Sequence, residues 1–454
     1  MQTSQIPTDA ATRAKFVRER LPKDGLFAGQ SWRIAPEAFA IEPELMEELE
    51  RLGPMLADFY RACNLLHRHS VSGKLPLWVA HYLDLGKPAE LIAAARSGRF
   101  KADLPRVIRP DVLITDGGIV ISELDSVPGG IGLTGWLNET YGALERWSVE
   151  ASQGMLDGFW SIFSTAREAC ATKSVRVVIS EESAGYRPEM IWLVEQLRAL
   201  ERDIEVVDLR AADVEKLKGC VVYRFFELFD IVNEPNAQKI LDAAMRGELE
   251  VTPPFKPWLE EKMVFAFLWH SQLRDYWRME LGEKTLAKLQ QIFPYTWIMD
   301  PTPLPPHAVI PELGIRDWRE MAKFSQKQRE LVLKVSGFSS QAWGSRGVWV
   351  GHDLSAAEWG AAIEGALKDF EHRPCILQRF HKSKVVSVSY YDFDASELKT
   401  MQGKARLCPY YFVSGPNDQA SVKLGGILAT ICPAENKLLH GKSDAIMAPC
   451  RARS

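Results

Sequence analysis

The chain has 454 residues, of which 46% are hydrophobic and 25% are charged, and its formal net charge is −4. This length predicts two or three domains, and the composition is that of a soluble globular protein. The slight acidic excess argues against a nucleic-acid partner, and no apolar run approaches the length of a membrane span, so we expect no membrane partner either.

The cysteines indicate the compartment. There are seven of them, scattered along the chain and without any Cys-x-x-Cys pair. Such spacing favours reduced thiols over a disulfide framework or a zinc site. The first residues show no basic stretch followed by an apolar one, so no secretory signal is expected. We therefore expect a cytoplasmic protein, and its oligomeric state stays open, with a homodimer as one candidate.

Apolar periodicity predicts helices on both sides of a central hairpin. The first helical region spans about 36–100, where Leu49, Leu52 and Leu56 repeat at helical spacing. A second helix is expected over about 140–170. The hairpin between these regions carries most of the charged residues of interest.

A strand–helix–strand unit is predicted to begin at Ser174. Short apolar strands are expected at 175–179, 204–208 and 220–223, with an amphipathic helix at about 188–201 after the first strand. Because strands that alternate with helices at this spacing usually lie parallel, the unit predicts a small parallel sheet.

The last third of the chain is predicted to be mixed. Prolines at 253–254 and 301–311 mark boundaries. Beyond them, strands are expected at 331–334 and 375–378, with a glycine- and serine-rich loop and a helix at about 355–371 between them. More strands follow toward the end of the chain.

The hairpin is the most informative stretch of the sequence. An Asp-Gly-Gly turn at 116–118 joins two apolar strands, which brings the carboxylates of Asp111, Glu123 and Asp125 to one end beside Arg109. Three converging acids favour a bound cation, and hard oxygen ligands suit Mg²⁺ that carries phosphates. The alternative is a surface hairpin whose acids are merely solvated.

A second group of chemical residues begins at Lys334, where an apolar strand ends. The loop that follows is rich in small residues: Ser336, Gly337, Ser339, Ser340, Gly344, Ser345 and Gly347. Backbone N–H groups of such a loop can approach phosphate oxygens, and the lysine supplies a positive charge to the same phosphates. The Gly-Lys-Ser/Thr ending of a Walker A loop is absent, and a flexible loop beside an exposed lysine is the alternative.

A hinge is predicted about thirty residues further on. The strand that contains Gln378 breaks after it into a polar connection at Arg379 and Phe380. Backbone groups there could pair with an adenine edge, with Phe380 as an apolar wall. A plain buried strand explains the same residues equally well.

Together these residues resemble the ATP-grasp superfamily. The resemblance is strongest in Arg109-x-Asp111 and Glu123-x-Asp125, and it implies that Arg109 contacts the transferring phosphoryl group while the three acids hold Mg²⁺. Asp125 stands where the family usually has asparagine. The acidic hairpin precedes the lysine and the glycine-rich loop, an order that resembles the circularly permuted branch similar to glutathionylspermidine synthase.

The resemblance extends to further residues that would bind ATP. Lys262, in Leu259-Glu-Glu-Lys262, matches the first ATP lysine and Lys334 the second, while 337–347 matches the mobile loop and 378–380 the adenine hinge. No acid follows Gln378 closely, so the contact to the ribose hydroxyls is unassigned.

The resemblance implies an α/β (α+β) fold, namely a circularly permuted ATP-grasp fold with a small Rossmann-like pre-ATP-grasp domain. The expected parts are a metal-binding part at 1–170, the small α/β domain at 171–252, and a part at 253–454 that holds the ATP lysines, the glycine-rich loop, the hinge and the final strands.

Several other polar residues leave two interpretations open. Arg187 and the run 223–227 follow strands of the small α/β unit, where a ligand or an ordinary helix start would each fit. Arg406, His440 and Lys442 interrupt apolar strands near the end of the chain, where a phosphate or substrate role competes with a solvated turn.

The function that the resemblance implies is an ATP- and Mg²⁺-dependent carboxylate–amine ligase, which forms an amide or peptide bond through an acyl phosphate. Its partners would be a small carboxylate and a small amine. One alternative keeps the ATP site but transfers the phosphoryl group to a hydroxyl, as a kinase does. The other is a non-catalytic nucleotide-binding protein.

Overall fold

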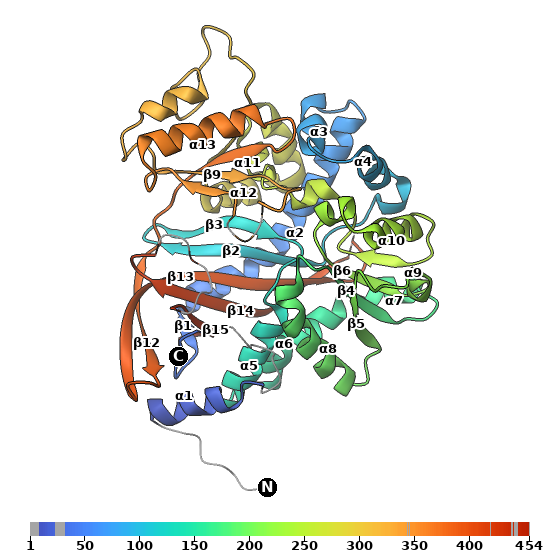
Figure 1. The fold of residues 1–454 in the computed structure, drawn as a ribbon, viewed down its shortest axis with the longest axis vertical. Helices are drawn as coiled ribbons and strands as arrows, with labels where there is room; N and C mark the ends of the chain where they lie inside the picture. The colour runs from blue at the N-terminus through green and yellow to red at the C-terminus, as the bar shows by residue number, and fades with distance from the viewer. Residues whose placement is uncertain are drawn as a thin grey trace.

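The computed structural model describes residues 9–22, 32–342, 344, 346–417, 419–436, 439 and 444–453. Over these residues the strands form three sheets with helices packed around them, so the α/β class is confirmed (Figure 1). Along the same residues, no helix combines the length and apolar character needed to cross a membrane.

The largest sheet unites strands from both ends of the chain. Within the described residues it has seven strands in the order β1-β15-β14-β13-β2-β3, with β12 paired to β13. All neighbours are antiparallel except β1 and β15. The strands are β1 (Phe39–Ile41), β2 (Val107–Thr115), β3 (Gly118–Asp125), β12 (Val385–Asp392), β13 (Glu397–Ser414), β14 (Ser421–Pro433) and β15 (Ile446–Ala452).

Both faces of this sheet are buried. In β13, Leu407 and Val413 belong to one core cluster, whereas Cys408 and Phe412 belong to another. Side chains that alternate along a strand point to opposite faces, so each face has its own core. Helix α2 (Pro43–Val71) contributes to the first cluster, and helices α5 (Ile131–Glu145) and α6 (Val149–Ser161) contribute to the second.

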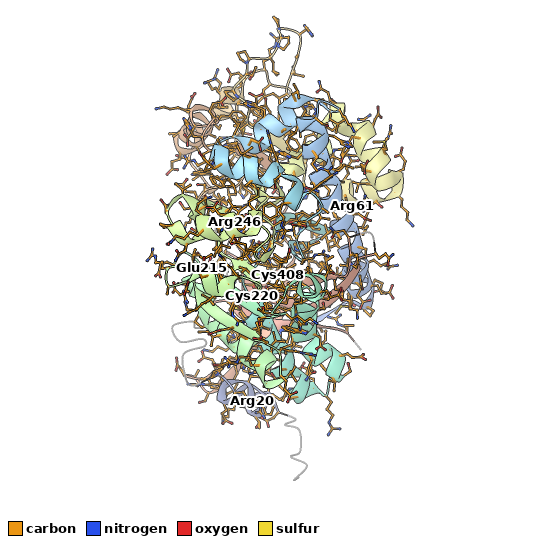
Figure 2. The ribbon with its side chains drawn as sticks, turned by 90° about the vertical axis from the view of Figure 1, so that its right-hand side faces the viewer. Arg20, Arg61, Glu215, Cys220, Arg246 and Cys408 are labelled. Carbon is orange, nitrogen blue, oxygen red and sulfur yellow. The ribbon has the colours of Figure 1, made fainter. Side chains whose placement is uncertain are left out.

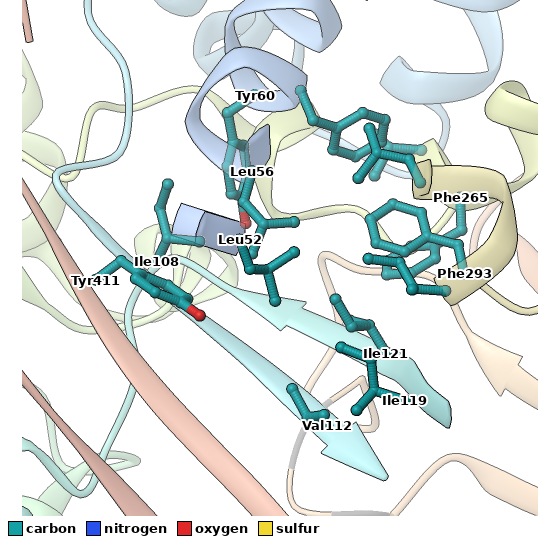
Figure 3. Packing of buried hydrophobic residues seen from close by; sticks show 14 of the residues in the cluster. Leu52, Leu56, Tyr60, Ile108, Val112, Ile119, Ile121, Phe265, Phe293 and Tyr411 are labelled. Atoms are coloured by element: carbon teal, nitrogen blue, oxygen red, sulfur yellow. The ribbon is translucent and has the colours of Figure 1, made fainter. Parts of the chain in front are cut away.

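Helix α2 supports the hairpin directly. Its apolar residues at helical spacing include Leu52, Leu56 and Tyr60, and Figure 3 shows them beside the two hairpin strands, in the same cluster as Ile108 of β2 and Ile121 of β3. The buried face of α2 therefore fixes the hairpin that carries the acids.

The second sheet is the predicted parallel one. Its order is β5-β4-β6-β7, and all its neighbours are parallel. The strands are β4 (Val175–Ile179), β5 (Ile204–Asp208), β6 (Val221–Phe225) and β7 (Glu250–Thr252), and the helices beside them are α8 (Arg187–Ala199), α9 (Val214–Leu217) and α10 (Pro235–Met245).

The third sheet is antiparallel, with the order β10-β9-β11-β8, and it lies above the hairpin in the view of Figure 1. Its register places Lys334 opposite Ile376 and Val332 opposite Gln378. The elements of this part are β8 (Thr296–Ile298), β9 (Leu331–Val335), β10 (Val348–Val350), β11 (Cys375–Arg379), α11 (Val264–Trp269), α12 (Arg274–Ile292) and α13 (Ala356–Lys368).

Two predicted helical regions are divided in the structure. The region at 36–100 begins with strand β1, and its helices are α2, α3 (Leu77–Asp84) and α4 (Ala89–Arg96). Pro76 and Pro88 stand as N-caps of α3 and α4, which explains two of the breaks. The predicted helix at 140–170 starts earlier and comprises α5, α6 and α7 (Ser164–Ala169). Helix α1 (Ala10–Glu19) packs near α5.

Candidate functional site

The charged residues of the hairpin share one face. Arg109 lies directly opposite Asp125, and Asp111 lies directly opposite Glu123. The guanidinium of Arg109 is 3.3 Å from Asp111 and 3.1 Å from Asp125, so one cation joins two acids from the two strands. Burial opposes the charge of Arg109, yet both carboxylates outweigh it and hold its pKa well above the usual value.

Strand β13 adds a second arginine to this face. Arg406 lies 3.0 Å from the carboxylate of Asp111, and the Cys408 thiol donates to the same carboxylate at 3.4 Å. The Nε atoms of Arg109 and Arg406 are buried and have no hydrogen-bond partner among the described residues. Arg406 therefore lies at the site. The sequence alone left this role open against that of a solvated turn.

Both predicted lysines lie at the hairpin. The ammonium of Lys262 is 3.1 Å from Glu123, and it also donates to the carbonyl of Ala342 in the glycine-rich loop at 2.6 Å. Burial disfavours the charge of Lys262, but Glu123 and Asp125 outweigh burial and raise its pKa.

Lys334 connects the third sheet to the hairpin. Its ammonium donates to the Gln378 side chain at 2.8 Å and to the backbone carbonyl of Ser122 at 2.9 Å. Burial lowers the pKa of this lysine to about 8. The two sheets thus meet through a cation that has no carboxylate bound to it among the described residues.

A cavity of about 680 Å³ lies between the hairpin and the third sheet. This volume is in the range of small-molecule and cofactor sites. Apolar strand residues line part of it, notably Val332, Val350 and Phe380. The charged side chains that line it are Asp111, Glu123, Glu330, Lys334, Arg379, Lys382, Lys404, Arg406 and Glu435. We call it the large cavity.

A second, small cavity of about 60 Å³ is also lined by Glu123. The glycine-rich loop reaches this cavity through Gly337 and Ser339, and Lys262 lines it as well. A Cβ atom at Gly337 would lie 2.7 Å from the carboxyl carbon of Glu261, so a larger residue there requires the Glu261 side chain or the loop to shift. We call it the small cavity.

Some of the remaining predicted residues lie away from the cavities. Within the described part of the loop, Ser340, Gly344 and Gly347 line neither cavity. Arg379 lines the large cavity, where it is exposed and pairs with Glu312 at 3.2 Å. Ser345, His440 and Lys442 lie outside the described residues.

Arg187 has a structural partner. It starts helix α8 and pairs with Asp208 of β5 at 2.7 Å. The interpretation of this segment as an ordinary helix start is therefore the one that the contacts favour. The neighbouring Glu189 accepts hydrogen bonds from the backbone N–H groups of Gly130 and Leu133, at 2.6 Å and 3.0 Å.

The donor chemistry of the hairpin fits Mg²⁺. Asp111, Glu123 and Asp125 offer only oxygen atoms from one face, and Mg²⁺ is usually held by one or two carboxylates together with substrate phosphates. Over the part of the chain that the structure describes, no group of three or more His, Cys, Asp or Glu side chains forms a metal site by itself. The phosphates would have to complete the coordination.

Some lining residues had no role in the sequence-based prediction. Glu330, Lys382, Lys404 and Glu435 line the large cavity, and Glu260 lines the small one. The alternation of Lys404 and Arg406 on one strand was a usable signal, because residues two apart share a face. The other positions depend on which distant segments meet, and local spacing does not contain that information.

Comparison with solved structures finds this fold elsewhere. A glutathione synthetase-like effector from Globodera pallida matches with a TM-score of 0.58 at 9% identity, over 99% of this chain and 98% of that one. A Methylobacillus flagellatus protein provisionally named gamma-glutamylcysteine synthetase matches with a TM-score of 0.38 at 11% identity, over 81% and 84% of the two chains. The first likeness shows a shared fold, and the second is too weak to argue from. No protein-family model and no curated protein sequence matches the chain.

Proposed function

We propose that the protein is an ATP-dependent carboxylate–amine ligase whose nucleotide binds in the large cavity. The observation that carries this proposal is the position of Lys334, which joins the third sheet to the acidic hairpin across a cavity of nucleotide size. Cations and apolar side chains line the same cavity, as a ligand with phosphates and a planar base requires.

Each part of ATP then has a partner. Val332, Val350 and Phe380 would enclose the adenine, with Gln378 and the backbone of Arg379 at its edge. Lys334, Lys404 and Arg406 would neutralise the phosphates, and the carboxylates of Glu330 and Glu435 are the available partners for the ribose hydroxyls.

The metal would lie at the hairpin. Asp111, Glu123 and Asp125 would hold Mg²⁺, which would neutralise part of the charge on the phosphates when it is bound. The residues of this chain would then position the reacting groups, and Arg109 would stabilise the charge that develops on the transferring phosphoryl group.

The reaction would have two steps. A carboxylate oxygen of the first substrate forms a bond to the γ-phosphorus, and the bond to ADP breaks. The nitrogen of an amine then attacks the acyl carbon, inorganic phosphate leaves, and the nitrogen loses a proton. No protein nucleophile is needed, because binding and orientation supply most of the rate enhancement.

The proposal includes a circularly permuted ATP-grasp arrangement. In its support, the acidic strands β2 and β3 precede the lysine strand β9 in sequence, and β2 pairs with β13 from the other end of the chain. The parallel sheet would be the Rossmann-like pre-ATP-grasp domain at 171–252, between parts at 1–170 and 253–454. A cytoplasmic location and a homodimer stay predictions.

A product assay tests the proposal. Purified protein is supplied with ATP, Mg²⁺ and a panel of carboxylic acids and amines, while ADP release and new amides are followed by a coupled assay and mass spectrometry. We expect ADP only when an acid and an amine are both present, and we expect Glu123→Ala to abolish turnover. A phosphorylated alcohol as product would instead show a kinase, and full activity in Glu123→Ala would contradict the assignment of the acids.

A further inference from the structure

The small cavity is lined by four carboxylates. They belong to Glu123 and Asp125 of the hairpin, Glu227 after strand β6, and Glu260 in the short 3-10 helix Pro257–Glu260. The only cationic side chain among the described lining residues is Lys262. A nucleotide does not fit in about 60 Å³, whereas a group of a few heavy atoms does, since one water needs about 10–15 Å³ of such volume.

Three of these acids already form ion pairs with cationic side chains. Glu123 pairs with Lys262 and Asp125 pairs with Arg109, both at 3.1 Å. Glu260 pairs with Arg224, a fully buried arginine at the end of β6. Among the described residues, Glu227 forms no ion pair.

Glu227 therefore faces the cavity without an ion pair of its own to any described residue. Burial, followed by the charges of Glu260 and Asp125, raises the pKa of Glu227 well above its usual value, and the charge of Arg224 offsets only part of this effect. Burial likewise raises the pKa of Glu260 to about 7. A cation inside the cavity would relieve the repulsion among these groups.

A neutral side chain points to the same conclusion independently. The hydroxyl of Ser126 lines the small cavity and is buried, with the residue 3% exposed, yet it has no hydrogen-bond partner among the described residues. Buried hydroxyls nearly always have a partner, so a ligand with a donor would complete this one.

We propose that the small cavity binds an ammonium group, with the carboxylates of Glu227 and Glu260 as its ion partners and the Ser126 hydroxyl as an acceptor. An ammonium has three N–H donors and a single charge, which matches two carboxylates that share one unpaired charge and one hydroxyl. Mg²⁺ would instead require near-octahedral oxygen coordination, whereas Phe229, Phe338 and Pro257 form part of the wall.

The position of the cavity gives this group a role. Glu123 lines both cavities, so the ammonium would lie next to the phosphates of ATP. This inference rests on the proposed function and makes it more specific: the second substrate of the ligase carries a positive charge when it binds, and Glu227 selects it.

The test is the binding of n-propylammonium chloride, followed by ligand-observed NMR at constant ionic strength. Propan-1-ol is the neutral probe of the same shape, and tetramethylammonium is the cation without N–H donors. We expect propylammonium to bind and the other two to bind at least tenfold more weakly, because charge and donors are both required. Glu227→Gln should weaken propylammonium roughly tenfold and Ser126→Ala a few-fold.

The matched control is Glu215→Gln, a glutamate on α9 that is 76% exposed and lies toward the edge of the molecule in Figure 2. Glu215→Gln should leave the affinity for propylammonium unchanged. Glu260→Gln is tested only if its thermal unfolding is native-like, because it leaves Arg224 buried without its acid. Equal affinity for propylammonium and propanol, or unchanged binding in Glu227→Gln, would overturn the proposal.

MgATP binding, measured by calorimetry on the same samples, separates the two proposals. Retained MgATP binding without ammonium binding would overturn only the ammonium site. Ammonium binding that depends on Glu227, in a protein without MgATP binding, would support the site and contradict the nucleotide proposal.

Discussion

The two cavities that share Glu123 differ in their charge balance. Among the described residues, the large cavity combines apolar strand residues with five cationic and four acidic side chains, whereas the small cavity gathers four carboxylates and a single lysine. A polyanion suits the first and a small cation suits the second. One hairpin supplies acids to both cavities, so the two proposed ligands would lie beside the same pair of strands.

The largest expected effect on stability concerns the ion pairs of the hairpin. Among the described residues, Arg109→Met leaves the buried Asp111 with Arg406 as its one remaining cation and the half-buried Asp125 with none, which should cost about 3 kcal/mol of unfolding free energy. Urea unfolding measures it. The control is Arg246→Met, an arginine labelled in Figure 2 that is 56% exposed and pairs with Glu248, where less than about 1 kcal/mol is expected. An equal loss of unfolding free energy in both variants would show that the stability of the protein does not depend on the ion pairs of Arg109.

A second prediction concerns the pH dependence of stability that arises from Glu189, a buried glutamate of helix α8. Burial raises the pKa of Glu189 to about 7, although backbone N–H groups bind its carboxylate. The folded state binds this proton more tightly than the unfolded state, whose pKa is near 4.5. The contribution of Glu189 to stability is therefore complete below pH 4.5 and is lost as the pH rises to about 7.

Glu189→Gln removes this titration. The free energy of unfolding of the native protein relative to the variant should fall by about 3 kcal/mol between pH 4 and pH 8. Urea unfolding at a series of pH values gives the curve. A difference that does not vary with pH would place the Glu189 pKa near its ordinary value.

Lys404→Gln should affect the large cavity alone. Lys404 lines that cavity and is partly exposed, so we expect MgATP affinity to fall roughly three- to tenfold, with a smaller loss at high salt. Propylammonium binding should be unchanged. A parallel loss of both ligands would show that the two cavities are not independent.

Gly337→Ala should affect the small cavity rather than the large one. The added Cβ would lie within 2.7 Å of the Glu261 carboxyl group, which costs about 1 kcal/mol and shifts the loop beside the small cavity. We expect a lower melting temperature and weaker propylammonium binding, with MgATP affinity nearly retained. Gly98→Ala is the control, because a Cβ there meets no atom within 4 Å.

Local patterns predicted much of this molecule. The turn at 116–118 fixed the hairpin, and strand–helix alternation was sufficient for the parallel sheet. Long-range pairing was not accessible: β2 lies beside β13, about 300 residues further along, and β1 depends on β15. For the same reason the sequence named Lys334 and the acids but missed Glu260, whose neighbours come from distant segments. Lys404 was missed although its spacing from Arg406 was a local signal.

Calorimetric titration of MgATP into the native protein and Lys334→Ala tests the central claim most directly. Lys334 is the cation between the third sheet and the hairpin, so its loss should weaken MgATP binding roughly 10- to 100-fold. Tight binding to the native protein with that loss is the result we predict. Absence of binding to the native protein, or equal binding to Lys334→Ala, would contradict the large cavity as the nucleotide site.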